Sequence, residues 1–102
     1  MLTNHGYLML KAMEGLTLRT VRPSFTVLQS VTAVPRSPLV RIEFGADGVP
    51  VTAEILEASS AKWFDDAVRS SLYRWRATGK RLESMEEGDI AVVELRIVVR
   101  PR

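Results

Sequence analysis

The stretch Ser59–Arg76, SSAKWFDDAVRSSLYRWR, has the pattern of a single amphipathic helix. Its apolar residues recur at spacings of three and four, so a helix would place on one side Phe64, Ala67, Val68, Leu72 and Trp75. Ser59 and Ser60 are candidate N-cap residues, and Gly79 lies where a C-cap glycine is expected. We therefore predict one long helix here, with Trp75 in the core and Trp63 at the margin of the apolar side.

Two clear strand patterns lie before this helix and one lies after it. Val40–Phe44 alternates apolar and charged residues, Asp47-Gly48 is a hairpin turn signal, and a return strand runs from about Val51 to Ala58. Beyond the helix, Ile90–Arg100 alternates in the same way. The order β-β-α-β predicts an α+β fold, an antiparallel β-sheet with one helix packed on one face.

The first part of the chain is predicted to be an N-terminal extension, residues 1–34, and the domain proper to span residues 35–102. Met1–Gly15 could form a short helix, whereas Leu16 and Leu18 alternate with polar residues as in a strand. Ser24–Ala33 is rich in β-branched residues, which favours an added strand.

The segment between the helix and the last strand, Ala77–Asp89, is polar. We expect it to be a connection without much regular structure, held to the core by Leu82 and Met85.

Composition excludes several classes of protein. The chain of 102 residues has the size of one small domain, and its 46% apolar and 25% charged residues are a globular mixture. A net charge of +2 is too small an excess to indicate nucleic-acid binding by itself. With one histidine and no cysteine, the sequence predicts neither a disulfide scaffold nor an ordinary zinc site, and no cofactor is expected.

Neither a membrane anchor nor a secretory signal is predicted. The apolar runs are far shorter than the roughly 20 residues that cross a bilayer. The start, MLTNHGYLMLKAMEG, lacks both the basic n-region and the sustained apolar h-region of a signal peptide. These observations leave open a cytoplasmic protein or a piece of a longer one.

Several residues of the β-β-α-β stretch are spaced as in a known family. The relevant residues are Asp47 and Gly48 in the turn, Ala58, Ser59 and Ser60 after the second strand, Asp65 in the helix, and Arg74, Trp75 and Arg76 at its end. From about Pro38 to Pro101 the chain resembles the C-terminal domain of TonB-type energy transducers. It departs from the family at Ala61, where Gly is usual, and at Ala77-Thr78, where an aromatic residue and Pro are usual.

The resemblance implies a non-enzymatic, periplasmic domain that binds an extended segment of an outer-membrane transporter. Binding would add that segment as a strand to the edge of the sheet, here at the last strand, residues Val92, Val93, Glu94, Leu95, Arg96, Ile97, Val98 and Val99. In two alternative interpretations, a different strand pairs with this edge. The chain's own N-terminal strand, Ser24–Ala33, could seal it, or a second copy could pair there, which would make the chain a structural dimerisation domain.

A second candidate surface combines Arg69, Tyr73 and Arg76, which a helix would make neighbours. With Lys80 and Arg81 nearby, this surface could contact an acidic partner or nucleic-acid phosphates. An ordinary solvated helix face with an Asp65–Arg69 ion pair explains the same residues, and we favour that explanation.

Candidate catalytic residues are few, and each has a simpler explanation. His5 has neither a cysteine in the chain nor a carboxylate near it in sequence, and Ser59 and Ser60 are expected to cap the helix. The acidic residues Glu86, Glu87 and Asp89 are expected to solvate a loop. Gly45–Gly48 lacks the Lys of a phosphate-binding loop. We therefore predict no catalytic activity and no small-molecule substrate.

Overall fold

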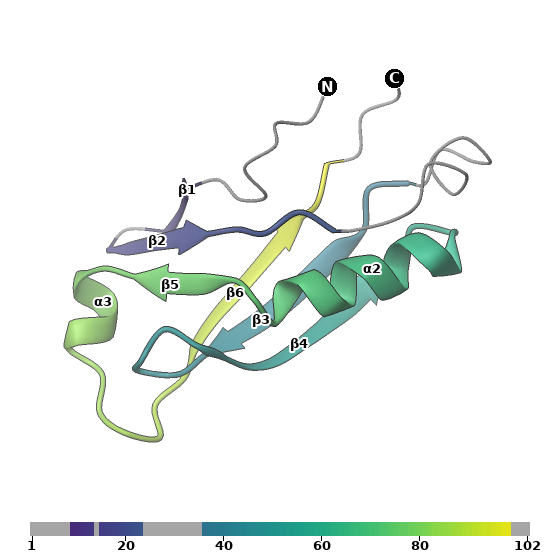
Figure 1. The fold of residues 1–102 in the computed structure, drawn as a ribbon. Helices are drawn as coiled ribbons and strands as arrows, with labels where there is room; N and C mark the ends of the chain where they lie inside the picture. Colours follow the sequence, from purple (N-terminus) through teal and green to yellow (C-terminus); the bar gives the residue numbers. More distant parts are fainter. Residues whose placement is uncertain (1–8, 14, 24–35, 99–102) are drawn as a thin grey trace.

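The computed structural model describes residues 9–13, 15–23 and 36–98 (Figure 1). The helices are α2 (Lys62–Leu72) and the short α3 (Lys80–Glu83). The strands are β1 (Met9–Met13), β2 (Leu16–Arg19), β3 (Leu39–Phe44), β4 (Pro50–Glu57), β5 (Arg76–Thr78) and β6 (Ala91–Arg96). They form two antiparallel sheets, a main sheet in the order β4-β3-β6 and a second sheet in the order β1-β2-β5. The predicted α+β fold with a β-β-α-β core is confirmed.

The core is shared by the main sheet, α2 and β2. Helix α2 lies against one side of the main sheet (Figure 1) and buries Phe64, Val68 and Leu72 in the same cluster as Val40. On the opposite face of the sheet, Arg41 forms ion pairs with Glu43 in the same strand and with Glu94 in β6. One covered face and one solvated face are typical of antiparallel sheets and explain the alternation in the sequence.

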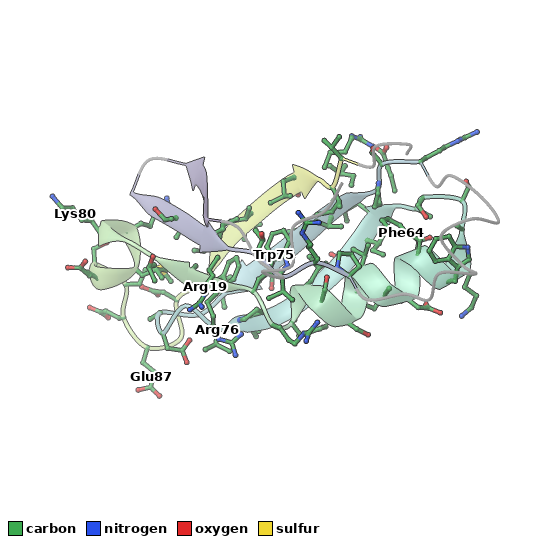
Figure 2. All side chains as sticks on the ribbon, turned by 45° about the horizontal axis from the view of Figure 1, so that its top comes forward. Arg19, Phe64, Trp75, Arg76, Lys80 and Glu87 are labelled. Carbon is green, nitrogen blue, oxygen red and sulfur yellow. The ribbon has the colours of Figure 1, made fainter. Side chains whose placement is uncertain are left out.

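Trp75 lies in the core, as predicted, with 4% of its surface exposed. Its indole Nε1 donates a hydrogen bond of 3.0 Å to the carbonyl oxygen of Val21, and Figure 2 shows the ring in the middle of the molecule. Trp63 is half-buried at the margin and packs edge-on against Phe64, with ring centroids 5.7 Å apart. Both indoles have the burial that was predicted, although Trp75 follows α2 instead of lying within it.

The predicted hairpin is confirmed, and its turn also joins the two sheets. Asp47 Oδ1 accepts the backbone N–H of Val49 at 3.0 Å, and Gly48 has a φ of +80°, which favours glycine. The carbonyl oxygen of Gly48 accepts the N–H of Ala77 in β5 at 2.9 Å. A Cβ at residue 48 would collide with the carbonyl oxygen of Ala77. Glycine is therefore required here by both the turn and the close approach.

Helix α2 is shorter than predicted, and its caps differ. The N-cap is Ala61 and the C-cap is Tyr73, so the prediction of N-caps at Ser59 or Ser60 is wrong. Ser59 is fully buried; its N–H donates to the Asp65 carboxylate at 3.0 Å, and its carbonyl accepts from the N–H of Arg36 at 2.7 Å. These bonds hold the β4–α2 connection to the helix and to the segment before β3.

The prediction that Gly79 is a helix C-cap is also wrong. The chain leaves the helix at Tyr73, enters β5 at Arg76 and reaches Gly79 as the N-cap of α3. Residue 79 has a φ of +130°, and a Cβ there would collide with the carbonyl oxygen of Gly15. The absence of a side chain at Gly79 allows close contact with the β1–β2 turn.

The N-terminal region and the connection after α2 form the second sheet. Residues 9–13 are strand β1, so the predicted short helix is wrong there, because Met9–Met13 pairs with β2. The predicted strand character of Leu16 and Leu18 is confirmed, and both are buried in the main core. The prediction for Ser24–Ala33 lies outside the described residues.

The segment Ala77–Asp89 is more ordered than predicted. It contains part of β5, which pairs with β2, and all of α3. Leu82 is buried and Met85 packs against the core, as expected for anchors. Pairing with a strand about sixty residues earlier explains the extra order, since β5 has only three residues and a weak pattern of its own.

Candidate edge strand for protein binding

Strand β6 lies at one edge of the main sheet. It pairs with β3 from Leu39↔Arg96 to Phe44↔Ala91 without a shift in register. Within the described part of the chain, β3 is its one strand neighbour. Five of the predicted binding residues, Val92–Arg96, lie in the strand, and Ile97 and Val98 follow it. Val99 lies outside the described residues.

The ladder determines which backbone groups of β6 face outward. Ile97 donates its N–H to the carbonyl oxygen of Pro38 at 2.9 Å, which makes this a hydrogen-bonded pair. Antiparallel pairs alternate between hydrogen-bonded and non-hydrogen-bonded. Every second residue before Ile97 therefore bonds to β3. The N–H and C=O groups of the residues between them point away from the sheet, and these residues are Val92, Glu94 and Arg96.

The side chains of these three residues lie on the solvated face of the sheet. Val92 is 37% exposed, and the side chain of Glu94 is 50% exposed, 3.9 Å from Arg41 Nε. Arg96 donates to Glu57 Oε1 at 3.0 Å and to the Ser37 carbonyl at 2.9 Å. An added strand would therefore meet an apolar, an acidic and a basic side chain in that order.

Strand β4, at the other edge of the main sheet, presents its backbone differently. Ala53 pairs with Ile42, whose backbone bonds toward β6, so the N–H and C=O of Ala53 point outward. The Tyr73 hydroxyl accepts that N–H at 3.2 Å and donates to that C=O at 3.4 Å. Sequence reasoning missed this role of Tyr73, because nothing in the pattern of α2 indicates contact with a backbone twenty residues earlier.

The ends of β4 are irregular as well. Its pairing with β3 shifts in register between Leu39 and Val40 and again between Glu43 and Phe44. Its first residue, Pro50, has no N–H to donate. Bulges, prolines and covering groups are the means by which proteins prevent pairing at a sheet edge. We call β4 the blocked edge and β6 the open edge.

The second predicted surface, Arg69, Tyr73 and Arg76, is not brought together as one patch of unpaired groups. Arg76 begins β5, and its guanidinium donates to the carbonyl oxygens of Tyr73 at 3.1 Å and Trp75 at 2.7 Å. Figure 2 shows it beside Arg19, its register partner in β2. Tyr73 is engaged with Ala53. A role of this surface in binding nucleic acid or an acidic partner stays a prediction.

The ion pair expected between Asp65 and Arg69 is wrong, because the Asp65 carboxylate is held by Ser59. Arg69 pairs instead with Asp66 at 3.2 Å, and Asp66 also pairs with Lys62 at 2.8 Å. The hydrogen bond from Lys62 and, to a smaller extent, the one from Arg69 hold the pKa of Asp66 below its ordinary value. This is a solvated network on an exposed helix face.

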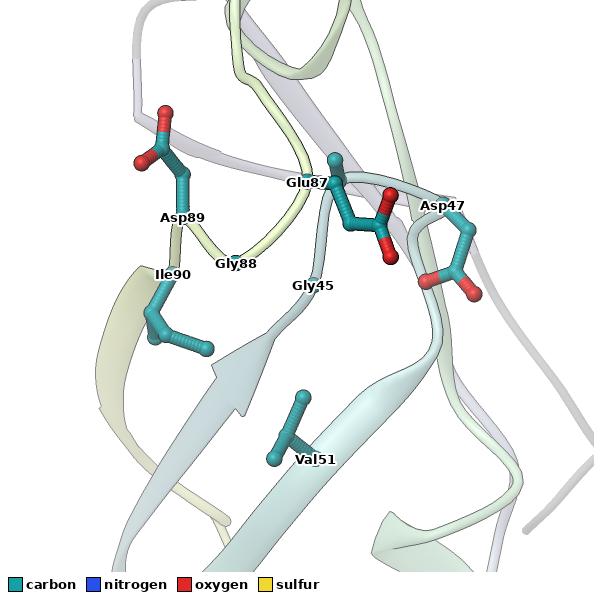
Figure 3. Close-up of a pocket in the computed structure, with 8 residues that line it drawn as sticks. Gly45, Asp47, Val51, Glu87, Gly88, Asp89 and Ile90 are labelled. Carbon is teal, nitrogen blue, oxygen red and sulfur yellow. The ribbon is translucent and has the colours of Figure 1, made fainter.

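A depression of about 450 Å³ lies at the end of the β3–β4 hairpin (Figure 3). Its lining includes the carboxylates of Asp47, Glu87 and Asp89. Asp47 accepts a backbone N–H within its turn, and Asp89 accepts the N–H of Glu86 at 2.9 Å. Among the residues that the structure describes, there is no group of three His, Cys, Asp or Glu side chains that could hold a metal ion. His5 lies outside this part of the chain.

No protein-family model matches the sequence, and no curated protein matches it either. Among the described helices, none combines the length and the apolar character needed to span a bilayer.

Proposed function

We propose that this chain is a non-enzymatic protein-binding module that takes up an extended segment of another protein as an added strand at β6. The observation that carries the proposal is the outward row of N–H and C=O groups at Val92, Glu94 and Arg96, in unbroken register. Backbone hydrogen bonds would supply affinity, and the alternating side chains would supply selectivity.

The contrast between the two edges supports the proposal. An exposed strand edge risks unwanted pairing, and β4 carries several features that prevent it. Since β6 has regular register and, among the described residues, neither a proline, a register shift nor a side chain bonded to its outward groups, we interpret its edge as one kept available for a partner.

The partner class follows from the resemblance of residues 38–101 to the TonB-type C-terminal domain. The resemblance points to the same strand and to a segment of an outer-membrane transporter, which would place the chain in the periplasm. The side chains of β6 add a chemical requirement. A segment that runs antiparallel would bind best with an acidic residue opposite Arg96, a basic one opposite Glu94 and an apolar one opposite Val92.

A synthetic peptide can test this requirement. The peptide Glu-Thr-Lys-Thr-Val, extended by Thr at both ends, meets it when antiparallel to β6. The control peptide exchanges Glu and Lys and so faces Arg96 and Glu94 with like charges. We expect the first peptide to bind more tightly and to slow hydrogen exchange at the amides of Val92, Glu94 and Arg96. Equal binding of both peptides, or protection elsewhere, would contradict the proposal.

Two proline variants separate binding from folding. Val92→Pro removes an outward N–H, so it should abolish peptide binding while the free energy of unfolding changes little. Val93→Pro removes an N–H that bonds to β3, so it should destabilise the fold by at least about 1 kcal/mol. Urea denaturation and peptide titration on both variants measure the two effects. Unchanged peptide binding by folded Val92→Pro would exclude β6 as the binding edge.

A further inference from the structure

The chemical requirement at the open edge is met by β6 itself. The residues that face outward carry, in order, an apolar, an acidic and a basic side chain, and Val98, two residues further, is 67% exposed. Read in the opposite direction, the same strand offers an apolar, a basic and an acidic side chain. A second copy, running antiparallel, therefore brings complementary groups.

One register satisfies every pair. When the two-fold axis passes through Leu95, each Glu94 lies opposite Arg96 of the other copy, and Val92 lies opposite Val98. An axis through Glu94 sets that carboxylate against itself, and an axis through Arg96 does the same for the guanidinium. Charge therefore selects one alignment, because like charges directly opposite each other are destabilising.

The other face of the strand agrees with this alignment. Leu95 and Ile97 are partly buried, at the border of the core, and Val93 is buried. The same register places Leu95 against Leu95 and Val93 against Ile97, so each pair on this face joins two apolar side chains. The border of one core would then continue into the other, and burial of apolar surface favours this contact.

We infer that two copies of this chain pair through β6 in the register centred on Leu95. The inference rests on the proposed function, since it uses the same backbone groups. The product is one continuous antiparallel sheet in which both β6 strands are internal and the blocked β4 strands form the two outer edges. Any other segment must then displace the second copy, so self-pairing would regulate access to the site.

Charge reversal tests the register. Glu94→Arg or Arg96→Glu alone sets like charges opposite each other at two symmetric positions, and we expect each to weaken dimerisation by about tenfold or more. An equimolar mixture of the two variants restores opposite charges at every position and should dimerise again, as should the double variant E94R/R96E. Sedimentation equilibrium over a wide range of concentrations measures each constant.

Arg96→Glu also places a carboxylate near Glu57, the in-chain partner of Arg96. The variant R96E/E57R keeps that ion pair with reversed charges and should behave like R96E in the mixing experiment. Thermal unfolding of each variant shows that the protein is folded. Tight dimers of both single variants would overturn the inference, because the contact would then lie elsewhere.

The outcome also separates this inference from the proposed function. A wild-type chain that is monomeric at all concentrations, yet is protected at Val92, Glu94 and Arg96 by the peptide, overturns self-pairing and leaves strand addition standing. A wild-type chain in which neither peptide nor concentration protects these amides overturns both. Concentration-dependent protection at the same amides, together with protection by the peptide in dilute protein, supports both when Val92→Pro abolishes each.

Discussion

The two edges of the main sheet are built from strands of similar length but are finished differently. Strand β4 begins with Pro50, shifts register twice, and has the outward groups of Ala53 bonded to the Tyr73 hydroxyl. Strand β6 keeps its register with β3 from Ala91 to Arg96. The comparison teaches that two edges of one sheet can present their outward backbone groups differently. Among the described residues, those of β4 are irregular and partly bonded to a side chain, whereas those of β6 follow a regular ladder.

The largest effect should come from the core on which both edges depend. Trp75→Ala removes a buried indole and its hydrogen bond to Val21, and should lower the free energy of unfolding by about 3–5 kcal/mol. Trp63→Ala, at the half-buried margin, is the matched control and should cost clearly less. Urea denaturation measures both. Equal losses would mean that the core is not centred on Trp75.

The next effect concerns the hairpin that fixes β4 beside β3. Gly48→Ala forces a φ of +80° on alanine and drives its Cβ into the carbonyl oxygen of Ala77. Strain of this kind costs about 1–3 kcal/mol, and the collision adds to it. Gly88→Ala is the control, since Gly88 has a φ of +95° but no heavy atom within 4 Å of its Cβ position. The difference in melting temperature between the variants isolates the close approach; no difference would refute it.

A smaller change should expose one pair of backbone groups on the blocked edge, while Pro50 and the two register shifts stay in place. Tyr73→Phe leaves the N–H and C=O of Ala53 without the hydroxyl and should cost about 0.5–1.5 kcal/mol. Hydrogen exchange should become faster at Ala53 and stay unchanged at Val93, which is bonded within the sheet. The variant should also associate more readily, which light scattering would detect. If exchange at Ala53 is unaltered, Tyr73 does not block this edge.

The smallest effect lies on the exposed side of α2, away from both edges. Lys62→Gln should raise the pKa of Asp66 more than Arg69→Gln does, because the hydrogen bond from Lys62 is the larger cause of the lowered value. Since the folded pKa is below the ordinary 3.8, any stabilisation is present above that value and is lost as the pH falls through the folded pKa. Side-chain carboxyl chemical shifts followed through a pH titration measure both variants. A larger rise for Arg69→Gln would reverse the assignment.

The sequence was sufficient for the elements that carry their own pattern. Alternation predicted β3, β4 and β6, the Asp-Gly signal predicted the turn, and the spacing of three and four predicted α2 and the burial of Trp75. These features depend on neighbours within a few residues, so periodicity and turn chemistry determine them.

The features that sequence reasoning missed depend on distant partners. Strand β5 has three residues and exists because β2 pairs with it. Ser59 looked like a helix cap, but the Asp65 carboxylate and Arg36 hold its backbone elsewhere. The hydroxyl of Tyr73 lies beside Ala53 only after α2 has packed on the sheet. For the candidate site, the sequence predicted the strand. Which of its backbone groups point outward could be determined only from its hydrogen-bonded pairing with β3.

The burial of Leu16 and Leu18 in the main core has a consequence for how the protein is made. Leu18 pairs with Ala77 in β5, both leucines pack in the main core, and Val21 accepts its hydrogen bond from an indole 54 residues later. Contacts of such sequence separation raise the contact order and slow folding. On the ribosome, β2 leaves the exit tunnel long before its partner exists. Until residues 75–78 emerge, the nascent chain must carry two leucines that its final fold hides completely, which makes this interval the one in which a chaperone has most to protect.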